Sequence, residues 1–223
     1  MPGTASALGA SVLLLFTGVS SARAEPRQWP ASGAVARAGT AVGFSEIGHR
    51  SVSTLGGQIA IGYRLGPFVL DAEYESLAML KYVEDAGEND DRGDLYRVGV
   101  TGRMFVLRVG RHRPDPSSLL RLYVEAGMGR QSARWSTGED FDRSDVSAGA
   151  GWLLDHRMRW RERGLPFSSI GWQFGWRLSA ARADGEDVVL RGTCKGKGCR
   201  PPPMPGPETD LGLLVTCSMT LGW

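Results

Sequence analysis

The residues at the C-terminal end, 213–223, constrain the fold most, because they alternate strictly between two kinds of side chain. Apolar residues occupy every second position: Leu213, Val215, Cys217, Met219, Leu221 and Trp223. Successive side chains of a β-strand point to opposite faces, so the pattern predicts a strand with one face in an apolar medium. The alternation runs to the last residue, whereas the ends of soluble domains usually fray. We therefore expect a strand that is held in place up to its end.

Seven earlier segments alternate in the same way, and each has about the 9–11 residues that a tilted membrane-spanning strand requires. They cover residues 34–44, 55–65, 68–76, 95–106, 119–129, 145–154 and 169–180. The sequence therefore predicts an all-β fold, an eight-stranded antiparallel up-and-down transmembrane β-barrel. Gly66-Pro67 is a tight turn, and the polar linkers after the first, third, fifth and seventh segments are expected on the opposite side, the longest over 181–209.

The N-terminal end indicates that the chain is secreted, which agrees with the predicted transmembrane barrel. An apolar run over 5–19 precedes Ala22-Arg23-Ala24, a pattern typical of a secretory signal cut before Glu25. The run is shorter than the ~20 residues of a spanning helix. We predict a signal peptide over 1–24 and a barrel domain over 25–223. The formal net charge of +2 gives no argument for a nucleic-acid partner.

The two faces of the predicted strands differ in chemistry. One face is apolar, and its aromatic residues are expected to face lipid, where they would form interfacial girdles: Tyr63, Tyr74, Tyr96, Trp152, Trp172, Phe174, Trp176 and Trp223. The other face is rich in glycine and arginine and is expected to hold an interior charge network: Arg37, Arg64, Asp71, Glu73, Glu75, Arg97, Arg103, Arg121, Glu125, Gln173 and Arg177. We expect the arginines there to meet the four carboxylates.

A soluble, lipocalin-like carrier would show the same alternation with the faces reversed, because its apolar side chains line a ligand cavity. The glycines on the polar face favour a crowded interior over a solvated one. The basic residues of that face are arginine, whose planar fork suits buried ion pairs. Both features favour the transmembrane barrel and leave the soluble carrier as an alternative.

The signal sequence, the eight alternating segments and the terminal aromatic together resemble the small outer-membrane barrels of the OmpA/OmpX type. The resemblance covers nearly all of the predicted mature chain, and it rests on architecture rather than on a family motif. It implies a monomer in the outer membrane of a Gram-negative bacterium, with an interior filled by side chains. It also implies contact with outer-membrane lipid, and recognition of the C-terminal strand by the barrel-assembly machinery.

Catalysis has to be considered, because lipid A deacylases and palmitoyltransferases share this architecture. His49-Arg50-Ser51 has the His-x-Ser spacing of the deacylases but lies early in the chain, whereas theirs lies late. His112 and His156 lie in basic linkers with no nearby serine nucleophile and are expected to be solvated. No His/Cys cluster has metal-ligand spacing. We predict no catalytic residue, no metal and no cofactor, with a lipid A-modifying or lipid-binding barrel as the alternative.

The three cysteines fit an oxidising compartment with at most one disulfide and one thiol left over. Cys194 and Cys199 frame Lys195-Gly196-Lys197-Gly198, and the two glycines let this short segment fold back. We predict a disulfide between them. Cys217 is expected to remain a free thiol on the lipid face of the last strand.

Overall fold

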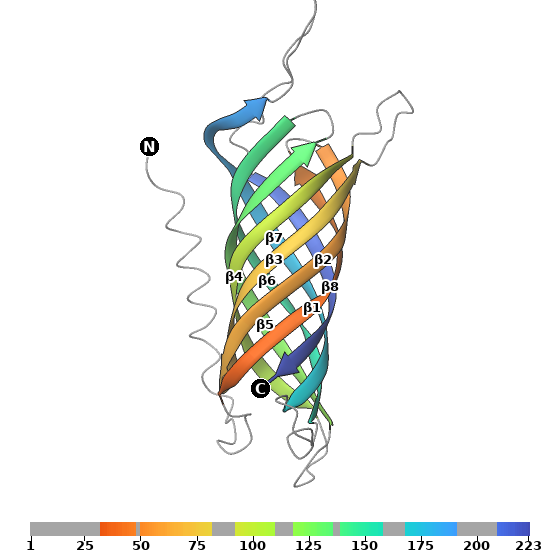
Figure 1. The fold of residues 1–223 in the computed structure, drawn as a ribbon, viewed down its shortest axis with the longest axis vertical. Helices are drawn as coiled ribbons and strands as arrows, with labels where there is room; N and C mark the ends of the chain where they lie inside the picture. Colours follow the sequence, from red (N-terminus) through yellow and green to blue (C-terminus); the bar gives the residue numbers. More distant parts are fainter. Residues whose placement is uncertain are drawn as a thin grey trace, which may run out of the picture.

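The chain forms a closed barrel of eight antiparallel strands in sequence order (Figure 1). The computed structural model describes residues 32–47, 50–81, 92–109, 118–135, 139–157, 168–190 and 209–223. The strands are β1 (Gly33–Ile47), β2 (Arg50–Leu65), β3 (Phe68–Lys81), β4 (Arg92–Val109), β5 (Ser118–Trp135), β6 (Glu139–Arg157), β7 (Ser169–Leu190) and β8 (Thr209–Gly222). The predicted fold class is confirmed. Within these ranges no helix has the length and the apolar character needed to cross a membrane.

The first and last strands close the barrel. β1 pairs with β8 from Val35 opposite Gly222 to Ser45 opposite Gly212. The Trp223 N–H also donates to the carbonyl oxygen of Ala34, 3.1 Å away. Closure pairs the edges that an open sheet would expose. The start of β1 and the end of β8 both lie at the lower end of the barrel in Figure 1.

The turn between β2 and β3 is the tight turn that the sequence predicts. Gly66 has a φ of 59°, in the left-handed region that glycine adopts without steric cost. Because Gly33, at the start of β1, pairs with Arg64 beside this turn, the turn lies at the same end of the barrel as the start of β1 and the end of β8. The hairpins β1–β2, β3–β4, β5–β6 and β7–β8 lie at the opposite, upper end (Figure 1).

Most strands extend further toward the upper end than their apolar alternation does. The linker expected after residue 44 is mostly strand, since β1 continues to Ile47 and β2 begins at Arg50. Likewise β7 continues to Leu190, inside the predicted long linker. Backbone pairing does not require apolar side chains, so a strand continues where its outward residues become polar. The apolar pattern therefore marks the apolar band of the wall rather than the full strand.

One irregularity changes the faces of β4. The pairing with β5 shifts between Phe105 and Leu107, which is a β-bulge at Val106. Phe105 points inward and is buried, and Leu107 points outward with 52% of its surface exposed. Phe105 has the inward parity of Arg103, so strict alternation already places its ring inside the lower part of the barrel. The bulge instead turns Leu107 outward, where strict alternation would have placed it inside.

The polarity of the wall is the reverse of that of a soluble barrel. Outward residues are large and apolar, such as Ile61, which is 72% exposed, and Leu70, which is 61% exposed. Inward residues between them are charged and buried, such as Asp71, which is 2% exposed. A lipocalin-like carrier has an apolar lining and a polar outside. That alternative is therefore wrong for the described barrel.

Candidate functional site

The barrel interior holds a continuous charge network at mid-height. Four arginines and five carboxylates share it: Arg37, Arg97, Arg103, Arg177, Asp71, Glu73, Glu75, Glu125 and Asp145. They come from β1, β3, β4, β5, β6 and β7, so the network ties almost the whole circumference together. All nine side chains are buried.

Glu73 is the centre of this network. Its carboxylate lies 2.9 Å from Arg177 Nη2 and 3.3 Å from Arg97 Nη1. It also accepts a hydrogen bond from Arg37, and Arg103 Nη2 lies 3.4 Å away. One carboxylate thus receives charge-assisted bonds from four guanidinium groups, which compensates for the burial of these charges.

Two further carboxylates link arginines across the lumen. Glu125 lies 3.1 Å from Arg103 Nε and 3.1 Å from Arg177 Nε. Glu75 lies 2.5 Å from Arg177 Nη1 and 3.8 Å from Arg97 Nη1. Each of the four guanidinium groups of the network thus has at least one carboxylate beside it.

Arg64 and Arg121 do not join the carboxylates expected for them. Both lie at the lower end, where Asp155 Oδ2 is 3.1 Å from Arg121 Nη2 and 3.9 Å from Arg64 Nη1. The guanidinium carbon of Arg121 lies 5.6 Å from the centre of the Phe105 ring, and that of Arg64 lies 5.5 Å from it. A cation over an aromatic face is favourable, so the inward ring contributes to holding both charges.

The structure adds three charged interior residues that the sequence-based set omits: Asp145, Asp155 and Arg143. Asp145 lies 2.9 Å from Arg97 Nε, and Arg143 Nη1 lies 2.8 Å from Asp210 Oδ2. Alternation along β6 gives all three the inward parity of Ser147, so the signal was available. With them, seven buried arginines face six buried carboxylates and the partly exposed Asp210.

Apolar layers lie above and below the charges. The upper layer consists of Ala41, Ile47, Val52, Leu77, Met79, Leu95, Ala133 and Trp135. The lower layer consists of Val69, Phe105, Tyr123 and Leu153. These layers separate the central network from both ends of the barrel. Side chains therefore fill most of the interior of the described barrel. A cavity of about 40 Å³ remains between the network and the upper layer, lined by Glu75, Leu77, Leu95, Arg97 and Arg177 among others.

Tyr123 connects the lower layer to the network. Its hydroxyl accepts a hydrogen bond of 2.9 Å from Gln173 Nε2, and Gln173 Oε1 accepts one of 3.1 Å from Arg103. The Tyr123 side chain occupies space left by two glycines on neighbouring strands, Gly151 on β6 and Gly175 on β7. A Cβ on Gly151 would lie 2.5 Å from the Tyr123 hydroxyl and 2.2 Å from the carbonyl oxygen of Phe174.

This close packing predicts that Gly151→Val destabilises the barrel by about 1–3 kcal/mol, the usual cost of overpacking a filled interior. The Phe174 carbonyl belongs to the backbone ladder and has little room to move. Urea unfolding of the refolded protein in lipid vesicles would measure the effect. Gly102→Val is the matched control, since a Cβ there meets nothing closer than 3.9 Å. Equal stability of the two variants would contradict the packing described.

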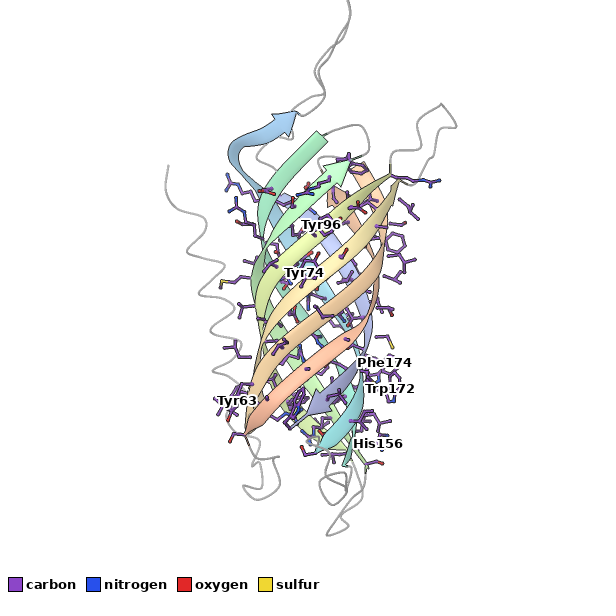
Figure 2. All side chains as sticks on the ribbon, in the orientation of Figure 1. Tyr63, Tyr74, Tyr96, His156, Trp172 and Phe174 are labelled. Atoms are coloured by element: carbon purple, nitrogen blue, oxygen red, sulfur yellow. The ribbon has the colours of Figure 1, made fainter. Side chains whose placement is uncertain are left out.

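The aromatic residues expected to face lipid all lie on the outer wall. Seven are between 37% and 49% exposed: Tyr63, Tyr74, Trp152, Trp172, Phe174, Trp176 and Trp223. Tyr96 is partly covered, because Arg134 lies over its ring at 5.7 Å. Figure 2 shows Tyr63, Trp172 and Phe174 toward the lower end and Tyr96 toward the upper end. Trp152 and Phe174 stack with ring centres 5.9 Å apart.

His156 lies in β6 and not in a linker, and a serine lies beside it, so both expectations from the sequence are wrong. Its Nδ1 lies 2.6 Å from the Oγ of Ser118, which pairs with it across β5 and β6 at the lower rim (Figure 2). The linear sequence separates them by 38 positions, and only the strand register brings them together. Asp155, the next residue on β6, points inward to Arg121 and does not orient the imidazole.

Of the remaining predicted residues, some lie in the described ranges and others do not. Cys217 lies on the outer face of β8 as a free thiol. Cys194 and Cys199 lie outside the described residues, as do the signal sequence, His49 and His112. In the described ranges, no group of three or more His, Cys, Asp or Glu residues could hold a metal ion.

The site and the fold define a filled, closed, eight-stranded barrel with a charged lumen and an apolar wall. This is the architecture of the small outer-membrane barrels that the sequence resembles. The sequence matches no protein-family model and no curated protein.

Among solved structures, the chain is similar in fold to Neisserial surface protein A (13% identity, TM-score 0.49). It is also similar to Ail, the attachment invasion locus protein of Yersinia pestis, alone (11% identity, TM-score 0.42) and with the heparin analogue sucrose octasulfate (10% identity, TM-score 0.41). Each similarity covers 87% of this chain and 100% of the other. At these identities the likeness concerns the fold alone.

Proposed function

We propose that the protein is an integral outer-membrane β-barrel with a structural or surface-interaction role and no catalytic activity. The observation that carries the proposal is the inverted polarity: a wall of exposed apolar residues around a paired charge network. An exposed apolar surface of this extent is unfavourable in water and is the surface that lipid covers. We propose that β8, with its terminal aromatic residue, is the segment that the assembly machinery recognises.

The layered interior supports a structural role over transport. The upper and lower apolar layers separate the charged centre from both openings, and the central carboxylates are engaged by arginines. A solute that crossed the barrel would have to displace both apolar layers and the ion pairs between them. The strands instead support a role at the surface, since most of them continue at the upper end beyond the apolar band (Figure 1).

Cell fractionation combined with gel migration tests the proposal. Expressed with its native N-terminus in a Gram-negative host, the full chain should be recovered in the outer membrane. Its folded form should migrate faster than the boiled form on a cold detergent gel, because a closed barrel resists detergent until heated. Recovery in the soluble periplasmic fraction would contradict a membrane location.

The Ser118–His156 contact favours one second candidate, a lipid-hydrolysing barrel. A serine beside an imidazole is the arrangement of an activated nucleophile, and this pair faces outward at the lower rim. The inward direction of Asp155 weighs against it, because a third group normally orients the base. A serine-reactive fluorophosphonate should leave the purified barrel unlabelled. Labelling that Ser118→Ala abolishes would establish the hydrolase instead.

A further inference from the structure

The cavity between the charge network and the upper apolar layer has a mixed lining. Its volume is about 40 Å³, and its apolar side belongs to the upper layer, with Leu77 and Leu95. More than half of the residues that line it are polar or charged: Ser45, Thr54, Glu75, Arg97, Gln131, Arg177 and Ser179. Cavities that stay empty in proteins are lined by apolar side chains, so this lining indicates a bound molecule.

Three small residues on adjacent strands leave this space. Gly212 on β8 pairs with Ser45 on β1 and with Ser179 on β7. A Cβ on Gly212 would lie 2.7 Å from Ser179 Oγ and 3.2 Å from Ser45 Oγ. Two hydroxyl groups, each able to donate and to accept a hydrogen bond, therefore border the same part of the cavity.

Gln131 lines the cavity from β5, across the barrel from β1. Its side chain is 5% exposed, and its Oε1 has no hydrogen-bond partner among the residues that the structure describes. A buried carbonyl oxygen is normally paired, because leaving it unpaired costs its full desolvation. The terminal torsion of glutamine has no single preferred value, so the amide can turn Oε1 toward a molecule in the cavity.

The chemistry of the lining selects water over an ion. The lining offers hydroxyl groups together with an amide oxygen, and water is the small molecule that both donates and accepts. Its charged groups are already paired, since Glu75 lies 2.5 Å from Arg177 Nη1 and 3.8 Å from Arg97 Nη1. Each buried water needs about 10–15 Å³ and two to four polar partners, so the cavity has room for two or three.

We propose that this cavity is a hydration site, in which ordered water molecules bridge Gln131 to the hydroxyl groups of Ser45, Thr54 and Ser179. Thr54 lies on β2, which contributes no residue to the central charge network, so the water molecules connect this strand to Gln131 and Glu75. Ordered water thus takes the place of side chains in this part of the interior. The site depends on the interior alone and does not rest on the proposed membrane location.

A crystal structure of the refolded barrel, at a resolution that shows ordered water, tests the proposal. Discrete density peaks should lie inside the cavity, with one at hydrogen-bond distance from Gln131 Oε1, about 2.7–3.2 Å. A cavity without density, or one that holds a detergent tail, would overturn the proposal. Crystals grown in bromide make an anion visible by anomalous scattering, and such a peak in the cavity would also overturn it.

Two glutamine variants make the test specific. Gln131→Leu removes the acceptor with little change in size, and the peak beside it should disappear. Gln58→Leu is the matched control: Gln58 is 3% exposed and its amide has no partner among the described residues, but it does not line the cavity. There the peak should remain. A peak that persists in Gln131→Leu, or disappears in both variants, would contradict the site.

Gel migration of the same samples shows whether each variant folds. The density of the wild type decides the proposal even where a variant does not fold.

Discussion

Replacing Glu73 with alanine should lower the unfolding free energy of the barrel by about 3–5 kcal/mol, the cost of leaving a buried charge without its partner. The carboxylate of Glu73 contacts four arginines, and it is 3% exposed. Its removal leaves the remaining network with as many carboxylates as arginines, but the vacated centre would hold converging positive charges. Urea unfolding in lipid vesicles, followed by tryptophan fluorescence, measures the loss.

Two variants make this result specific. Glu46→Ala removes one carboxylate from an exposed position on β1 and should change stability by no more than about 0.5 kcal/mol. Glu73→Ala combined with Arg37→Met removes a charge pair together, and it should recover part of the loss, because the buried guanidinium is gone. If Glu73→Ala and Glu46→Ala had the same small effect, the interior network would not hold the barrel together.

The faces of the strands could be predicted because side-chain parity is a local property. Once Leu213 and its alternate neighbours are assigned to the wall, the direction of every second residue follows from the period of two. The same rule places Glu73 and Arg97 inside without knowledge of the fold. It fails at Val106, where the bulge breaks the period for a reason that the local sequence does not show.

The pairing of charges could not be predicted, because it depends on the register around the closed barrel. Arg97 and Asp145 are 48 positions apart, and Arg177 and Glu73 are 104 apart. Which carboxylate a given arginine reaches is set by the stagger of several strands together. Arg121 illustrates this: the sequence-based set offered it four partners, and the structure gives it Asp155.

The predicted strands were shorter than the observed ones for a related reason. The apolar alternation stops where the wall leaves its apolar surroundings, at Met128 on β5, but the backbone pairing continues to Trp135. Polar outward residues such as Ser132 give no periodic signal. The hairpin ends of this fold are therefore less visible in the sequence than its middle.

The central claim is that the apolar wall lies in lipid, and an arginine scan of that wall tests it most directly. Ile59 is outward, 56% exposed and in the middle of the apolar run of β2, whereas Ser51 is outward on the same strand above the run. Unfolding in lipid vesicles should show that Ile59→Arg costs about 2–4 kcal/mol and Ser51→Arg about 0–1 kcal/mol, because the cost of a lipid-facing arginine depends on depth. Equal, near-zero costs at both positions would mean that the wall faces water, and would contradict the account.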